Sequence, residues 1–193
     1  QSPSSAASDV YKRQAIILPK TQSFDFLATL APMIDFKNKL VPLIETSRAI
    51  ETVTQIAAFK DVVGLFFGAA DASASLGCKL AWEPLLYARH RVVLAASMFN
   101  LFTIDAPYFY IDKMAGLKEE AEAVKNLGFT GKAAIHPDQI DYINEAFSPS
   151  AEEKAEAKKV LEEYQKSGGG AIKVDGQMTV SYTHLRAHET LPY

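Results

Sequence analysis

The sequence lacks several features that would place it in whole classes of protein. It has one cysteine, Cys78, in 193 residues; this excludes an internal disulfide and is typical of a reducing compartment, so we expect a cytoplasmic protein. No apolar run approaches the roughly 18 residues of a membrane helix, so we expect no membrane partner. The net charge of −3 and the lack of a basic, aromatic-rich patch argue against a nucleic-acid partner. No GxGxxG motif follows any apolar run, which removes the main sequence support for a dinucleotide-binding sheet.

What the sequence does contain is a repeated pattern of apolar runs. Hydrophobic residues make up 48% of the chain and charged residues 22%, which is typical of a globular protein with a sizeable core. A parallel strand buried on both faces reads as a short apolar run, and a helix usually leads to the next strand. Five such runs precede helix-like stretches: AIILPK (15–20), LVPLIET (40–46), VVGLFFGAAD (62–71), LFTIDAP (101–107) and GKAAIHP (131–137). Each has a polar residue at or near its end, namely Lys20, Glu45, Asp71, Asp105 and His136.

Repeated strand–helix units have two common solutions, an open doubly wound sheet or a closed eight-stranded barrel. A TIM (β/α)8 barrel typically needs about 250 residues, more than the five units here occupy. We therefore predict an α/β fold that is an incomplete TIM barrel, with strands 4–8 present and the first three units missing. The predicted domain extends over residues 15–180 and includes a charged helix over 151–166 and a terminal hairpin.

The two ends of the chain depart from this pattern. Residues 1–14 and 181–193 are polar and aperiodic and have no arrangement of a secretion signal. Both are similar to translated adapter sequence at the edges of sequence assemblies, so we expect them to be non-native extensions. On this interpretation His184 and His188, whose spacing suggests a metal site, have no function.

Polar residues at the ends of the runs are the candidates for chemistry, because the active sites of parallel α/β folds lie beyond the carboxyl ends of the strands. Glu45 and Asp71 end consecutive runs, so in a barrel their carboxylates would converge over its mouth. Two carboxylates with open coordination positions suit a hard divalent ion such as Mg²⁺. The alternative is that both acids only cap the helices that follow them, since acids favour helix N-termini.

Residues close to these acids are candidates for binding substrate. Gly68, Ala69 and Ala70 are small enough to let backbone N–H groups approach a carboxylate or enolate oxygen. A tight turn before Asp71 would need small residues as well. Lys20 is either a cation for an anionic substrate or an ordinary charge at a strand end.

Four further residues have more than one interpretation. His136 precedes Pro137, which predicts a fixed loop, and a structural role for this histidine remains open. Asp105 either belongs to the site or forms a turn. Arg89 and Arg91 lie in a helix predicted over 83–100, and we expect them to form ion pairs or to contact a neighbouring subunit.

Six motifs, in this order, resemble the citrate lyase β-subunit-like family of the HpcH/HpaI aldolase superfamily, which includes the malyl-CoA lyases. They are LPK, LIETSRAI, GLFFGAADASASLG, WEPLLYARHRVVLAA, IDAPYFYID and GFTGKAAIHPDQI. The resemblance extends over essentially all of residues 15–180. It implies a TIM barrel, usually a homotrimer, that forms or cleaves carbon–carbon bonds in acyl-CoA or acyl-carrier thioesters with Mg²⁺.

The resemblance also implies roles for individual residues. Glu45 in LIET matches a catalytic metal ligand that also touches substrate, and Asp71 in GAAD matches the second catalytic metal ligand. The small residues before Asp71 would lie at the substrate carboxylate, and His136 and Pro137 would line a thioester or nucleotide channel. The chain departs from the family in lacking the strands that carry its substrate arginine and other acids, and in having Ala70 where many relatives have an acid.

We therefore expect a Mg²⁺-dependent carbon–carbon lyase or Claisen-type synthase. Its substrate would be a 3-hydroxyacyl-CoA thioester such as malyl-CoA or citramalyl-CoA, and its products a small 2-oxo acid and an acyl-CoA. We expect the chain by itself to be inactive or weakly active without the substrate arginine. A citrate lyase β subunit acting on a citryl-carrier thioester and a CoA-independent 2-oxo acid aldolase are alternatives. A non-catalytic assembly or binding module is the alternative from another class, although it would need neither Glu45 nor Asp71.

Overall fold

The computed structural model describes residues 15–33, 39–167, 171–174 and 177–179. The chain divides into two compact units, one ending at Phe147 and the other beginning at Ser148. The pattern of apolar runs does not indicate this division. The predicted non-native ends, with His184 and His188, and the tip of the predicted hairpin at 175–176 lie outside the described residues.

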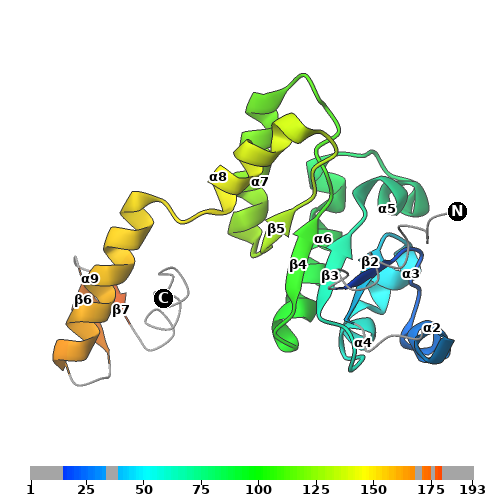
Figure 1. Cartoon of the computed structure of the whole chain (residues 1–193), viewed down its shortest axis with the longest axis horizontal. Coiled ribbons are helices and arrows are strands. Elements are labelled where there is room, and N and C mark those ends of the chain that lie inside the picture. Colours follow the sequence, from blue (N-terminus) through cyan, green and yellow to red (C-terminus); the bar gives the residue numbers. More distant parts are fainter. Residues whose placement is uncertain (1–14, 34–38, 168–170, 175–176, 180–193) are drawn as a thin grey trace, which may run out of the picture. The chain divides into compact units, whose positions relative to one another are not determined.

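The first unit is built on a five-stranded sheet in which every pair of neighbours is parallel (Figure 1). The strands are neighbours in the order in which they occur in the sequence. A doubly wound sheet reverses its order at a switch point, whereas a barrel continues in one direction, so this order is typical of a barrel-type fold. The predicted α/β fold with a parallel sheet is confirmed. Each predicted run supplies one strand: β1 (Ile16–Leu18), β2 (Leu40–Ile44), β3 (Gly64–Phe67), β4 (Phe102–Asp105) and β5 (Gly131–Lys132).

Helices or short helical turns follow every strand of this sheet, and α6 packs against both β3 and β4 (Figure 1). In order they are α2 (Phe24–Leu30), η1 (Ala31–Met33), α3 (Ser47–Glu51), α4 (Val53–Ala57), α5 (Ala69–Leu76), α6 (Trp82–Met98), α7 (Met114–Leu127), η2 (Pro137–Gln139) and α8 (Ile140–Phe147). None of the described helices is long and apolar enough to cross a membrane.

The stretch that follows β2 has one apolar stripe at helical spacing but forms two short helices, α3 and α4. They meet at Thr52, whose hydroxyl donates to the carbonyl of Arg48 at 2.9 Å and to that of Gln22 at 3.0 Å. A threonine that bonds the carbonyl four residues back tends to bend a helix. The apolar stripe is still buried, since Ile50 and Ile56 are no more than 4% exposed.

Local signals in the sequence set several helix ends. The Thr46 hydroxyl accepts the backbone N–H of Ala49 at 3.1 Å and so caps the start of α3. Gly128 ends α7 with a φ of 104°, in the left-handed region that favours glycine.

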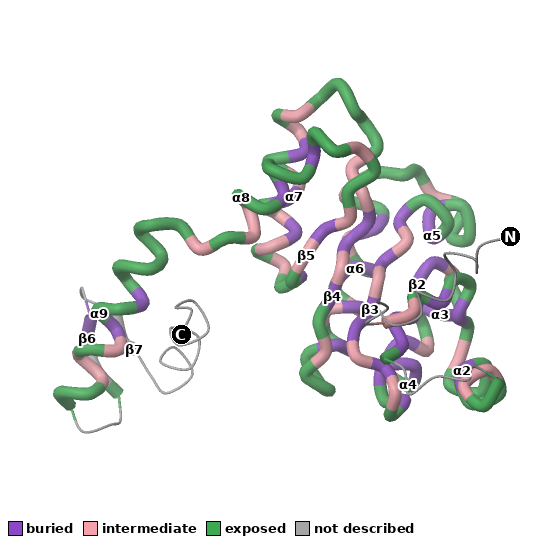
Figure 2. Tube along the Cα trace, viewed as in Figure 1, coloured by how far each residue is buried: buried purple, intermediate pink, exposed green. Residues whose placement is uncertain are grey.

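The core of the first unit lies between the sheet and the helices that cover it. Figure 2 shows buried positions along the strands and along one side of α6. Apolar burial of this kind stabilises a fold by roughly 25 cal/mol per Å² removed from water. The largest fully buried apolar side chains are Phe67, Leu27, Ile44, Ile56, Leu65, Leu85, Leu117, Val53, Val92 and Val124.

The second unit contains α9 (Ala151–Ser167) and an antiparallel pair, β6 (Ile172–Val174) and β7 (Gln177–Thr179). Ser150 and Glu153 form a capping box: the Ser150 hydroxyl accepts the N–H of Glu153 at 3.0 Å, and the Glu153 carboxylate accepts the N–H of Ser150 at 2.8 Å. The helix and the strand pairing of the hairpin are both as predicted.

Candidate metal and substrate site

Three neighbouring strands bring Lys20, Glu45 and Asp71 together at the carboxyl end of the sheet. Glu45 follows β2 directly, Asp71 lies in the first turn of α5 after β3, and Lys20 lies just after β1. Because these strands are parallel and adjacent, residues that follow them meet at one edge of the sheet. We call these three residues the acid-pair site.

Glu45 is held in place from two directions. Its side chain is only 4% exposed, and its Oε1 accepts the backbone N–H of Lys20 at 2.7 Å. On the other side lies Gly68, whose N–H donates to the carbonyl of Ile44 at 3.0 Å. A Cβ at position 68 would lie 2.6 Å from the Glu45 Cβ and 3.1 Å from its Oε2. Glycine is therefore required here because the carboxylate packs directly against the backbone.

Asp71 is the exposed member of the pair. Its side chain is 55% exposed, and its Oδ2 accepts a hydrogen bond from the Lys20 ammonium at 2.7 Å. This hydrogen bond holds the pKa of Asp71 below its ordinary value. Glu45 contacts the same ammonium, so the two carboxylates lie close to each other.

The Lys20 ammonium lies between the two acids. Its Nζ is 2.7 Å from Asp71 Oδ2 and 3.5 Å from Glu45 Oε1. The hydrogen bond to Asp71 raises the pKa of Lys20, so the ammonium is charged at neutral pH. Lys20 also has a φ of 54°, in the left-handed region that non-glycine residues seldom adopt. This backbone conformation accompanies the hydrogen bond from its N–H to Glu45.

The donors of the acid-pair site suit a hard divalent cation. Two carboxylates supply oxygen ligands, and the bridging ammonium shows that positive charge is stabilised between them. In the described part of the chain no third histidine, cysteine, aspartate or glutamate joins them to form a larger ligand cluster. Water and substrate oxygens would therefore have to fill most positions of an octahedral shell.

The small residues before Asp71 form the turn into α5. The first hydrogen bond of the helix runs from the N–H of Ala72 to the carbonyl of Gly68 at 2.9 Å. The N–H groups of Ala69 and Ala70 therefore precede the helical hydrogen bonds and are free of partners within the helix. Their binding of a substrate carboxylate stays a prediction.

His136 and Pro137 do not share contacts with the acid-pair site. The last strand of the five-stranded sheet, β5, ends at Lys132, so His136 lies in the loop beyond it. Its Nδ1 accepts the N–H of Asp138 at 3.3 Å, and Pro137 follows as the first residue of η2. No hydrogen bond or ion pair among the described residues links His136 to Glu45 or Asp71. The structural alternative explains these contacts, and a channel role for the two residues stays a prediction.

A second polar cluster, not predicted as a unit, lies between the sheet and the helices. Asp105 ends β4, is fully buried, and accepts hydrogen bonds from Arg89 Nε at 2.9 Å and from Lys132 Nζ at 2.8 Å. Lys132 Nζ also lies 2.6 Å from Glu120 Oε1 and 2.7 Å from the carbonyl of Ala106. We call Asp105, Arg89, Lys132 and Glu120 the buried ion network. The expected ion pair of Arg89 is confirmed.

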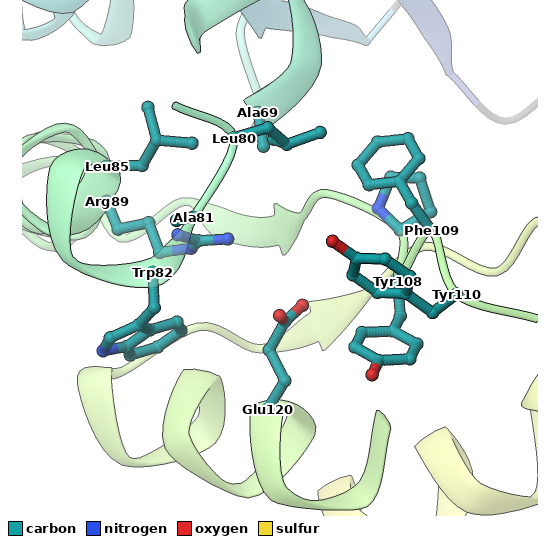
Figure 3. A pocket seen from close by; sticks show the side chains of 11 residues that line it. Ala69, Leu80, Ala81, Trp82, Leu85, Arg89, Tyr108, Phe109, Tyr110 and Glu120 are labelled. Carbon is teal, nitrogen blue, oxygen red and sulfur yellow. The ribbon is translucent and has the colours of Figure 1, made fainter. Parts of the chain in front are cut away.

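Arg89 also borders a cavity of about 200 Å³ beside this network (Figure 3). Its guanidinium carbon lies 4.7 Å from the ring centre of Trp82 and 5.2 Å from that of Phe67, which gives it aromatic contacts on two sides. Glu120 and Tyr108 face the same cavity, and burial, followed by the charge of Glu120, raises the pKa of Tyr108. Arg89 Nη1 is buried and has no hydrogen-bond partner among the described residues.

Comparison with known proteins assigns the family. Residues 11–137 match the family described as HpcH/HpaI aldolase/citrate lyase. The chain belongs to this family. A citrate lyase subunit beta-like protein of Mycobacterium tuberculosis is 34% identical over 173 residues, which cover 86% of this chain and 61% of that protein. Human mitochondrial citramalyl-CoA lyase is 33% identical over 189 residues, covering 85% of this chain and 55% of the human protein.

Solved structures of similar proteins share the fold. The crystal structure of CitE from M. tuberculosis in complex with magnesium, acetoacetate and coenzyme A has a TM-score of 0.80 and 31% identity, and covers 98% of this chain and 73% of that chain. RipC from Yersinia pestis has a TM-score of 0.70 and 42% identity, and covers 72% of this chain and 66% of that chain. The family resemblance predicted from the motifs is thus confirmed. The chain spans only 55–61% of the length of the two curated relatives named above.

Proposed function

We propose that the protein is a Mg²⁺-dependent carbon–carbon lyase, or Claisen-type synthase. Its substrate is a 3-hydroxyacyl-CoA thioester such as malyl-CoA or citramalyl-CoA, and its products are a 2-oxo acid and an acyl-CoA. The observation that carries this proposal is the convergence of the Glu45 and Asp71 carboxylates at the ends of adjacent parallel strands. Similarity to proteins named citramalyl-CoA lyase and citrate lyase subunit beta supports the substrate class. In this proposal the sheet is an arc of a (β/α)8 barrel.

The two acids have different tasks in this proposal. Glu45 is buried and fixed by the Lys20 backbone and by Gly68, so it sets the position of the ion and of the substrate oxygens beside it. Asp71 is exposed and completes the protein's share of the ligands. A Mg²⁺ ion held there would polarise the carbonyl of the 2-oxo acid and offset the charge that develops on it. The relative CitE has been crystallised with magnesium, which supports this choice of metal.

Backbone groups and the Lys20 side chain would bind the rest of the 2-oxo acid. The N–H groups of Ala69 and Ala70, at the start of α5, would donate to a substrate carboxylate or enolate oxygen. In the direction of cleavage, the proton of the substrate hydroxyl would pass to solvent while the carbon–carbon bond breaks and the hydroxyl carbon becomes the carbonyl of the 2-oxo acid. The electron pair of the broken bond would form the thioester enolate, which takes up a proton from solvent to give the acyl-CoA.

The test uses the longest reading frame that contains this sequence, with the present chain assayed beside it. Malyl-CoA, methylmalyl-CoA and citramalyl-CoA are incubated with Mg²⁺ or with EDTA, and the 2-oxo acid is trapped as its phenylhydrazone. We expect product only with Mg²⁺, and none above background from the Asp71→Asn variant. Full activity after chelation, or in a Glu45→Ala/Asp71→Ala double variant, would contradict the proposal. Sedimentation of the same protein tests the homotrimer that the resemblance implies.

Thioester hydrolysis is a second candidate, because proteins of Cereibacter sphaeroides named (3S)-malyl-CoA thioesterase are 30% identical over 186 residues and cover 93% of this chain. Hydrolysis releases free coenzyme A, whereas carbon–carbon cleavage leaves the thioester intact. A thiol reagent in the same assay separates the two reactions. Free thiol without a 2-oxo acid would identify a thioesterase.

A further inference from the structure

The Lys20 ammonium lies where the proposed function requires a metal ion. Its Nζ contacts one oxygen of each acid, 2.7 Å from Asp71 Oδ2 and 3.5 Å from Glu45 Oε1. We propose that Lys20 is a resident counter-ion of the acid pair, which a divalent cation displaces and which is then released to bind the substrate. This inference rests on the proposed function, since it takes Glu45 and Asp71 as the metal ligands.

The two cations compete for the same charges. Two carboxylates close to each other repel unless a positive group lies between them, and here the ammonium is that group. A Mg²⁺ ion binds its oxygen ligands at about 2.0–2.1 Å. An ion bound to both acids would therefore lie very close to an ammonium that contacts the same acids, and like charges at such a distance repel strongly.

Lys20 contacts the acid-pair site through two groups, its backbone N–H and its side-chain ammonium, and the ammonium can move without the backbone. Its backbone N–H donates to Glu45 Oε1 at 2.7 Å and fixes that carboxylate whatever the side chain does. Its ammonium is held only by ion pairs, on a side chain that is 58% exposed. Exposed ion pairs of this kind are weak, and the four-carbon stem is flexible. The ammonium can therefore leave Asp71 without moving β1 or Glu45.

Displacement gives the ammonium a second use at the same site. Once released from Asp71, it remains tethered beside the bound metal, at the exposed rim of the acid-pair site. A 2-oxo acid brings a carboxylate to this rim, and a lysine offers a point charge that can follow it. Lys20 would thus neutralise the acids before the metal binds and the substrate afterwards.

The test measures how fast the Lys20 amine reacts, in the chain as it is. The protein is treated briefly with sulfosuccinimidyl acetate, with and without Mg²⁺ at equal ionic strength, and acetylation of each lysine is measured by mass spectrometry. We expect Mg²⁺ to speed acetylation of Lys20 several-fold and to leave the exposed Lys79 unchanged. Binding of Mn²⁺ to the same preparation, measured by electron paramagnetic resonance, shows separately whether the site takes a metal.

The outcomes separate this inference from the proposed function. If Mn²⁺ binds but Mg²⁺ leaves the reactivity of Lys20 unchanged or lowers it, displacement is wrong and the metal site stands. If no metal binds, both proposals fail. As a second measurement, Lys20→Met should bind Mn²⁺ several-fold more tightly than the parent chain. Lys79→Met removes the same charge from an exposed loop and should not change the affinity; equal gains in both variants would overturn the inference.

Discussion

The acid-pair site and the buried ion network use the same kinds of residue at the same end of the sheet. In the first, Lys20 and Asp71 form an ion pair in which both side chains are more than half exposed. In the second, Lys132 has no exposed side-chain surface and contacts three oxygens, two of them from carboxylates. The two lysines therefore differ in the burial of the ammonium and in the number of oxygens that it contacts.

The energetic consequence follows from desolvation. An exposed ion pair contributes about 0–1 kcal/mol, so its loss hardly affects folding. Removing one partner of a buried pair costs roughly 3–5 kcal/mol, because the remaining charge has neither water nor a counter-ion. We therefore assign exchange of cations to the acid-pair site and support of the sheet–helix packing to the buried ion network.

The largest expected effect is on the buried ion network. Lys132→Met leaves Asp105 with Arg89 alone and Glu120 without its cation, so we expect a loss of roughly 3–5 kcal/mol in the free energy of unfolding. Urea denaturation followed by circular dichroism measures it as a lower midpoint or as loss of the folded baseline.

The matched control for this variant is Lys118→Met. Lys118 pairs with Glu145 at 3.3 Å, but both side chains are about half exposed or more. We expect this control to change stability by less than about 1 kcal/mol. Equal losses in the two variants would mean that burial does not distinguish the clusters.

The ion pairs of the buried ion network could not be predicted from the sequence. The apolar runs predicted all five strands, because a strand that is buried on both faces consists of consecutive apolar residues. The run GKAAIHP, however, indicated His136 as its polar end, whereas β5 ends at Lys132. The pairing of Lys132 with Asp105 depends on the register of two strands and on the helices above them. A single sequence holds no record of those distances.

More of the acid-pair site than of the buried ion network could be predicted from the sequence. Glu45 and Asp71 follow consecutive predicted strands, so their proximity follows from a parallel sheet alone. The role of the Lys20 backbone could not be predicted, because its positive φ and its bond to Glu45 depend on packing around that turn. The need for glycine at position 68 likewise becomes visible only when Glu45 is placed beside it.

A smaller change tests whether the fixed position of Glu45 matters for metal binding. Gly68→Ala places a Cβ against Glu45 and must shift its carboxylate, so we expect about a tenfold loss of Mn²⁺ affinity, in the range seen when supporting contacts of metal ligands are removed. Gly131→Ala is the control, since a Cβ there meets nothing within 4 Å. Calorimetry on both variants compares them, and an unchanged affinity in Gly68→Ala would show that the Glu45 position is unimportant.

The smallest expected effect concerns pH. The pKa of Asp71 is lowered in the folded chain, chiefly by the Lys20 hydrogen bond, so the contribution of this pair to stability is present above the ordinary carboxyl pKa. It is lost as the pH falls through the lowered value, below about pH 4. Carboxyl carbon resonances in a nuclear magnetic resonance titration report this pKa directly. Lys20→Met should raise it, and an unchanged titration would remove Lys20 from the acid-pair site.

The most direct test of the account is metal binding by the acid pair itself. Isothermal calorimetry measures the binding of Mg²⁺ and Mn²⁺ to the chain, to its Glu45→Gln and Asp71→Asn variants, and to the double variant that has both substitutions. Circular dichroism checks that each variant is folded. We predict one divalent ion per chain, with an affinity at least about tenfold weaker in each single variant, since each loses one of two charged ligands. Binding that persists unchanged in the double variant would contradict the account.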